Sequence, residues 1–143
     1  MKSLVKYISA VLLFAAAATF TAGAQNNGQS QAEPDYEKQI KQQVDYFIET
    51  YHLDDIQAFR LDTLLQHYLP IYNEEVDKLK ASGISMMESF QPMLDKWADF
   101  FDRSYEKIFT PEQWKRYIKS AAGKEKKKRD IRMAEAAAGS SKK

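Results

Sequence analysis

The chain has 143 residues, with 21 Lys and Arg against 20 Asp and Glu, two histidines and no cysteine. Without cysteine it can form neither a disulfide framework nor a thiol nucleophile, so its stability must come from packing. It also lacks a Gly-rich phosphate loop. An enzyme needs a nucleophile or a titrating group with a second side chain that activates it, and the sequence shows no such pair. We therefore expect a protein that is not an enzyme and needs no cofactor.

The N-terminal segment has the pattern of a secretory signal peptide. Lys2 and Lys6 give a basic start, an apolar run covers residues 8–20, and small residues follow up to Ala24. This run is too short for a convincing membrane span, and small residues before Gln25 suit a signal peptidase. No cysteine stands at the cleavage point, which excludes a lipid-anchored lipoprotein. We predict cleavage between Ala24 and Gln25 and a periplasmic or secreted protein.

Removal of residues 1–24 leaves 119 of the 143 residues. This length is typical of a single domain. Residues 25–33 are polar and predict a flexible leader. Residues 34–122 carry apolar side chains at helical spacing and predict one helical domain. Residues 123–143 are basic and then rich in alanine, and we expect a tail that is frayed when free and that can form a helix only when docked.

The first two helices follow from apolar spacing and helix-end residues. Pro34 suits a first helical turn. Spacings of three and four then mark one apolar stripe: Tyr36, Ile40, Val44, Phe47, Ile48 and Tyr51. Asp54 and Gln57 predict a capping box at the start of the second helix. Pro70 predicts a kink or a split near residues 66–69, and Gly83 ends this helix by permitting a left-handed turn.

Two further helices complete an all-α fold of about four amphipathic helices. The third begins after Ser85 or Ser89 and has the widest apolar face: Phe90, Leu94, Trp97, Phe101, Tyr105 and Ile108. The fourth begins with Thr110 as cap and Gln113 as its capping-box partner. Phe109 and Trp114 are spaced for a hydrophobic staple across that helix start. No stretch alternates with the period of two that a strand requires.

Two of these helix starts share a pattern, Leu53-Asp-Asp-Ile-Gln57 and Phe109-Thr-Pro-Glu-Gln113. They resemble the paired Leu-Thr-x-x-Gln motifs of the Spy/CpxP family of small periplasmic helical proteins. Asp54 stands where that family prefers threonine, and Phe109 where it prefers leucine. The resemblance implies a thin, curved cradle of four helices in a hairpin-like arrangement, usually a homodimer. It also implies ATP-independent binding of unfolded envelope proteins, or sensing of envelope stress.

Methionines and aromatic residues near the third helix are candidates for client binding. Methionine adapts its shape and is common on promiscuous surfaces, although it also fills gaps in a core. Phe100 and Phe101 point about 100° apart on a helix, so either a wide face is buried or some aromatic surface is exposed. Because little protein lies behind each face of a thin layer, we predict client contact by these residues: Met86, Met87, Phe90, Trp97 and Phe101.

The histidines and the charge pattern give little evidence for a metal, a nucleic acid or a membrane as partner. His52 suits a helix C-terminus, and neither it nor His67 has the neighbours of a zinc site, so we predict no metal site. Residues 33–112 hold 17 Asp and Glu against 8 Lys and Arg, whereas residues 113–143 hold 3 against 11. Export and the lack of interleaved aromatics argue against nucleic acid, and leave weak electrostatic contact with a membrane open.

The leading hypothesis is a periplasmic, ATP-independent chaperone or envelope-stress protein that binds unfolded or partly folded envelope proteins. One alternative is an exported helical scaffold or adaptor for one specific protein partner. A metal-responsive sensor is a third, less favoured reading.

Overall fold

The computed structural model describes residues 36–83 and 87–140, and these form helices joined by short turns. The helices are α2 (Tyr36–Tyr51), α3 (Asp55–Ala81), α4 (Met87–Ile108), α5 (Pro111–Lys119) and α6 (Ala121–Ser140). The described ranges contain no strand, so the all-α prediction is confirmed. None of these helices is both long and apolar enough to cross a membrane.

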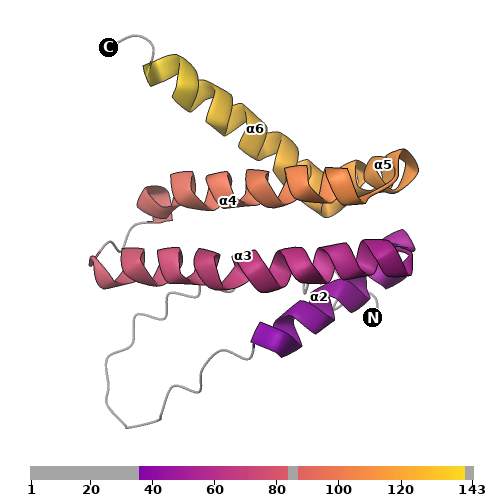
Figure 1. Cartoon of the computed structure of the whole chain (residues 1–143). Coiled ribbons are helices and arrows are strands. Elements are labelled where there is room, and N and C mark those ends of the chain that lie inside the picture. The colour runs from indigo at the N-terminus through magenta and orange to yellow at the C-terminus, as the bar shows by residue number, and fades with distance from the viewer. Residues whose placement is uncertain (1–35, 84–86, 141–143) are drawn as a thin grey trace, which may run out of the picture.

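Helices α3 and α4 run side by side in opposite directions and form the long axis of the molecule (Figure 1). Helix α2 packs against α3, and α5 lies at the same end of the α3–α4 pair as the C-terminal end of α2. Helix α6 turns back from α5, contacts α4, and then rises away from it toward the C-terminus (Figure 1). The end of the molecule where α2 and α5 meet is called the motif end below.

The core joins two kinds of side chain. On α3 the buried side chains are aliphatic along most of the helix, with Leu61 fully buried. At the motif end the core consists of aromatic rings in contact: Phe47, Tyr51, Tyr105, Phe109 and Tyr117. Large rings bury much area per side chain, and edge contacts between them add specific geometry. The motif end therefore has a dense aromatic core.

Helix α3 passes through Pro70 as one helix of 27 residues, so it is not split there. The predicted kink over residues 66–69 stays a prediction. Ser82 caps the end of the helix, and Gly83 follows with φ of +77°, a left-handed conformation that glycine adopts without steric cost. The predicted stop at Gly83 is therefore confirmed. Of the two expected starts of the third helix, Ser85 lies outside the described residues, and the start at Ser89 is wrong, because α4 already begins at Met87.

The C-terminal segment differs from the frayed tail that we expected. Residues 121–140 form α6, which packs on α4. The physical reason is electrostatic, because Arg129 and Arg132 of α6 pair with Asp102 and Asp95 of α4. A pattern of basic residues predicts solvation only when no acidic partner is near, and the acidic partners here lie 27 and 37 residues earlier in the chain.

Candidate functional site

Both predicted capping boxes are present at the motif end. Asp54 Oδ1 accepts from the Gln57 backbone N–H at 2.8 Å, and the Asp54 N–H donates to Gln57 Oε1 at 3.1 Å. The second turn repeats this geometry, since Thr110 Oγ1 accepts from the Gln113 N–H at 3.3 Å and the Thr110 N–H donates to Gln113 Oε1 at 2.8 Å. Each box satisfies backbone donors that a helix start leaves free.

The two glutamines also bind each other. Gln57 Nε2 donates to Gln113 Oε1 at 2.7 Å, and Gln113 Nε2 donates to Gln57 Oε1 at 3.1 Å. Each Nε2 donates further to a carbonyl of the opposite turn, to Ile108 at 2.8 Å and to His52 at 3.0 Å. Both amides thus use two donors and two acceptors, which is their full capacity. We call this set the glutamine clasp.

The clasp is symmetric about its centre. His52 stands two residues before the cap Asp54, and Ile108 stands two residues before the cap Thr110. Each carbonyl therefore occupies the same place relative to its own motif. Because the two turns are related in this way, one set of bonds fixes α2–α3 against α4–α5.

Apolar residues of the two motifs pack beneath the clasp. Leu53 and Phe109, which precede the two caps, are both buried. The rings of Phe109 and Trp114 lie 6.5 Å apart, which is the staple contact predicted from the sequence. His52 closes α2 with φ of +57°, a left-handed conformation that histidine adopts less readily than glycine. The motif residues therefore cap α3 and α5 and connect the two turns at this end of the molecule.

The aromatic residues predicted to contact a client are inside the protein. Phe90 and Trp97 are 6% and 8% exposed, and Phe101 is 1% exposed. Phe100 is half-buried and packs on Tyr68 at 4.5 Å between ring centroids, so α4 buries a wide face instead of exposing aromatic surface. These three side chains have no free face for a client in this structure.

The two methionines predicted beside them are not described in full. Met86 and the side chain of Met87 lie outside the described residues. Their contact with a client stays a prediction.

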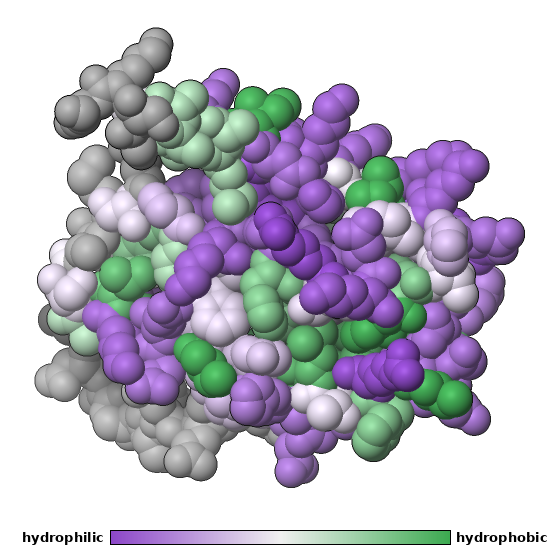
Figure 2. Space-filling model, turned by 45° about the horizontal axis from the view of Figure 1, so that its top comes forward, coloured by the Kyte–Doolittle hydropathy of each residue, from purple (hydrophilic) through white to green (hydrophobic). Residues whose placement is uncertain are grey.

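The exposed apolar side chains lie elsewhere, above all on the outward face of α3. Ile56 and Phe59 are 65% and 70% exposed, one helical turn apart, and Ile71 on the same helix is 42% exposed. Sequence reasoning missed Ile56 and Phe59 because they lie off the main apolar stripe of that helix. Figure 2 shows one face of the molecule, on which hydrophilic side chains cover much of the surface and hydrophobic side chains form smaller groups between them.

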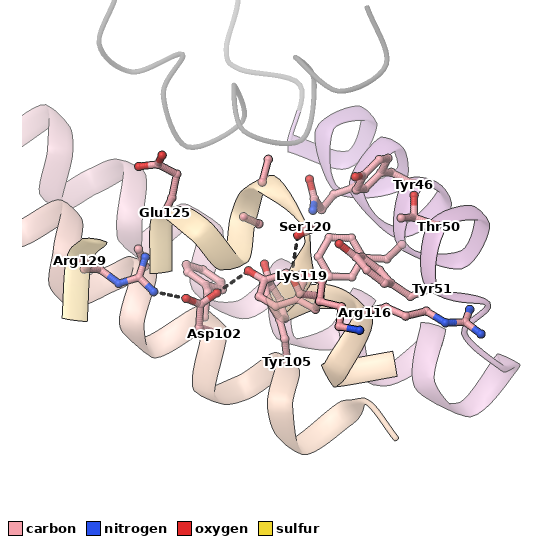
Figure 3. A pocket seen from close by; sticks show the side chains of 17 residues that line it. Tyr46, Thr50, Tyr51, Asp102, Tyr105, Arg116, Lys119, Ser120, Glu125 and Arg129 are labelled. Atoms are coloured by element: carbon pink, nitrogen blue, oxygen red, sulfur yellow. Dashed lines mark hydrogen bonds and ion pairs between the residues drawn. The ribbon is translucent and has the colours of Figure 1, made fainter. Parts of the chain in front are cut away.

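Buried charges hold α6 on α4. Asp102 accepts from the Tyr117 hydroxyl and pairs with Arg129, and both partners of that ion pair are buried (Figure 3). Asp95 takes two hydrogen bonds from Arg132, at 2.7 and 3.0 Å. Arg132 is 42% exposed, so its pair with Asp95 lies at the edge of the interface. Two acidic residues seven apart on one helix were the available sequence signal for this contact.

Burial and ion pairing shift the pKa values of the Asp102 and Asp95 carboxyl groups in opposite directions. Burial raises the pKa of Asp102, against the lowering effect of Tyr117 and Arg129. Partial burial would also raise the pKa of Asp95, but hydrogen bonds from Arg132 and Gln91 and the nearby arginine charges hold it below its usual value. The two ion pairs therefore respond oppositely to pH.

The structure brings together no group of three or more His, Asp or Glu residues that could hold a metal ion within the described ranges. His67 lies beside Tyr68 on α3, with 4.6 Å between ring centroids. His52 contributes its backbone carbonyl to the clasp.

Comparison with known proteins adds no relative. No protein-family model, no curated protein and no solved structure matches this chain.

Proposed function

We propose that this chain is an exported helical protein that binds non-native polypeptides of the cell envelope without ATP, similar in mode to the Spy/CpxP proteins. The proposal includes the thin, cradle-like arrangement and the homodimer that the resemblance implies. It rests on a signal-peptide pattern at the N-terminus and on two capped motifs of related sequence. Helical hairpins with weakly selective apolar faces suit the capture of many unfolded segments.

The single observation that carries the proposal is the glutamine clasp. A cap followed by glutamine is good helix-starting chemistry in any fold, so each motif alone has little weight. Here the two glutamines, 56 residues apart, bond to each other and to the carbonyls that precede the opposite caps. A paired function for the two motifs explains why both carry glutamine at the same position.

The outward face of α3 is the surface proposed for client contact. Ile56 and Phe59 present large apolar side chains to solvent directly beside the clasp residue Gln57. Neighbouring Arg60 and Asp62 give this face both signs of charge, which supports encounter with varied segments. Phe90, Trp97 and Phe101 then support the helices that carry the surface, whereas Met86 and Met87 remain candidates for contact.

The experiment measures aggregation of a reduced or heated client by light scattering, with purified protein lacking residues 1–24 and no ATP. We expect suppression near stoichiometric ratios by the wild-type protein. The double substitution Ile56→Ser/Phe59→Ser should reduce the suppression, and Ile131→Ser, which changes an exposed isoleucine on α6, should leave it intact. Suppression that is absent in the wild type, or equal in all three proteins, would contradict the proposal.

The second candidate is a scaffold that binds one specific partner through the same face of α3. It predicts a single stoichiometric partner and indifference to unfolded polypeptide. A metal-responsive sensor is the third candidate, and it predicts that zinc shifts the melting temperature of the purified protein.

A further inference from the structure

Helix α6 contributes little to the apolar core. The buried apolar side chains of the described residues all fall between Ile40 and Tyr117, so none of them is on α6. Ala122 is the α6 residue that packs against this core, and it is only partly buried. Because burial of apolar area is the main favourable term in packing, α6 has a weak hydrophobic attachment to the rest of the molecule.

The buried ion pair that holds α6 is incompletely satisfied. The side chains of Arg129 and Asp102 are 7% and 5% exposed, and the buried Arg129 Nε has no hydrogen-bond partner among the described residues. Both charges lose their hydration when α6 docks, and this loss can exceed the attraction between them. Separation of α6 from α4 hydrates both charges together, which costs far less than the removal of one partner alone.

A single residue joins α6 to α5. Ser120 has φ of −75° and ψ of 176°, an extended conformation between two helices. Rotation about this one residue can move α6 without unwinding α5. Figure 1 shows that the C-terminal part of α6 already rises away from α4.

Helix α6 also forms one wall of a cavity of about 620 Å³. Helices α2, α4 and α5 supply all the aromatic rings of the lining, including Tyr51, Phe101 and Tyr105. The lining residues on α6 are small or charged: Ala121, Ala122, Glu125 and Arg129. Figure 3 shows Glu125 and Arg129 on the opposite side from Tyr46 of α2. The weakly attached helix therefore covers an aromatic groove.

We infer that α6 is a detachable cover. It leaves α4 while α2 to α5 stay folded, because neither the glutamine clasp nor the aromatic core of the motif end includes a residue of α6. Its departure exposes the aromatic rings of the cavity lining to solvent. For client binding, a step that rests on the function proposed above, these rings give a second apolar surface in addition to the outward face of α3.

Hydrogen exchange measured by mass spectrometry tests the opening, on protein lacking residues 1–24. We expect residues 121–133 to exchange faster than α2 to α5, because they open without the rest. Arg132→Glu places a carboxylate against Asp95 and should speed exchange of residues 121–133 about tenfold, with α2 to α5 unchanged. Lys127→Glu is the matched control, since it makes the same charge change at an exposed position of α6.

Two exchange results would overturn the inference. One is exchange of residues 121–133 at the same rate as α2 to α5, which would show that α6 opens only when the whole protein unfolds. The other is equal acceleration by Arg132→Glu and Lys127→Glu, which would show that the contact with Asp95 does not hold α6.

A tether between α4 and α6 tests whether opening uncovers the rings. The chain has no cysteine, so the double variant Asp95→Cys/Arg132→Cys can be bridged specifically by a short bismaleimide. The matched control is the same variant with both thiols capped by N-ethylmaleimide. Nile red, a neutral dye that fluoresces on apolar surface, should give a stronger signal with the capped form than with the bridged form. Equal signals would overturn the inference.

Light scattering with an aggregating client separates the cover from the proposed function. Stronger suppression by the capped form than by the bridged form would support client binding to the uncovered rings, and equal suppression would overturn that step. Absence of suppression in the wild type and in both forms would contradict the proposed function, whereas exchange and Nile red binding would still decide whether α6 is a cover.

Discussion

The motif end and helix α6 are attached to the α3–α4 pair by different kinds of interaction. At the motif end, α2 and α5 are held by aromatic rings and by the neutral hydrogen bonds of the glutamine clasp. Helix α6 is held by two Asp–Arg pairs and few large apolar side chains. Neutral contacts depend little on pH and salt, whereas ion pairs depend on both. The motif end should therefore be the stable part of the molecule, and α6 the part that solution conditions control.

The largest effect should come from breaking the buried ion pair of α6. Arg129→Met leaves the buried Asp102 carboxylate without its cation, and we expect a loss of about 3 kcal/mol in the free energy of unfolding, measured by urea denaturation. The control is Arg132→Met, which removes a 42% exposed arginine and should cost less than about 1 kcal/mol. Equal losses in the two variants would show that burial does not distinguish the pairs.

The glutamine clasp should rank second. Gln57→Ala removes bonds to Asp54, Ile108 and Gln113, and we expect a loss of about 2 kcal/mol. A double-mutant cycle with Gln113→Ala should show a coupling free energy of about 1 kcal/mol, because the two amides bond directly. Gln66→Ala is the control, since the exposed side chain of Gln66 bonds to Asp62 within α3 and takes no part in the clasp. Additive effects of the two clasp substitutions would contradict a mutual interaction.

A smaller effect isolates one helix cap from the clasp. Thr110→Ala keeps Gln113 but removes the hydroxyl that accepts from its backbone N–H, and we expect a loss of about 1 kcal/mol, seen as a lower melting temperature. Thr63→Ala, in the interior of α3, should cost nothing, because alanine is the better helix former there. A melting temperature for Thr110→Ala that matches the wild type would count against the cap.

The smallest expected effect is on how stability depends on pH. It distinguishes Asp95 from Asp102, the two α4 carboxylates that pair with arginines of α6. The pKa of Asp95 is lowered, so its contribution to stability is present above its usual pKa and is lost as pH falls through the lowered value. The pKa of Asp102 is raised, so its contribution is present at low pH and is lost as pH rises through the raised value.

Urea denaturation at a series of pH values tests this difference. Between about pH 5 and about pH 2, Asp95→Asn should lose less stability on acidification than the wild type, and Asp102→Asn should lose more. Parallel pH profiles for all three proteins would show that neither carboxyl group is shifted as described.

The amino-acid sequence alone determined that helices α2 to α5 form and how α3 and α5 begin. The caps at Asp54 and Thr110, the stop at Gly83 and the aromatic stripe of α4 follow from bonds and spacings within a few residues, which any window of the chain displays. The same spacing placed the apolar stripes of α2, α3 and α4, since a period near 3.6 residues puts the apolar side chains on one side.

Only the tertiary structure decided which residues meet across the chain. The bonding of Gln57 to Gln113, the docking of Arg129 on Asp102 and the exposure of Phe59 depend on how whole helices are placed. A side chain such as Phe101 looks equally apolar in sequence whether it is buried or exposed. Its burial depends on which neighbouring helix covers it, and residues dozens of positions away supply that helix.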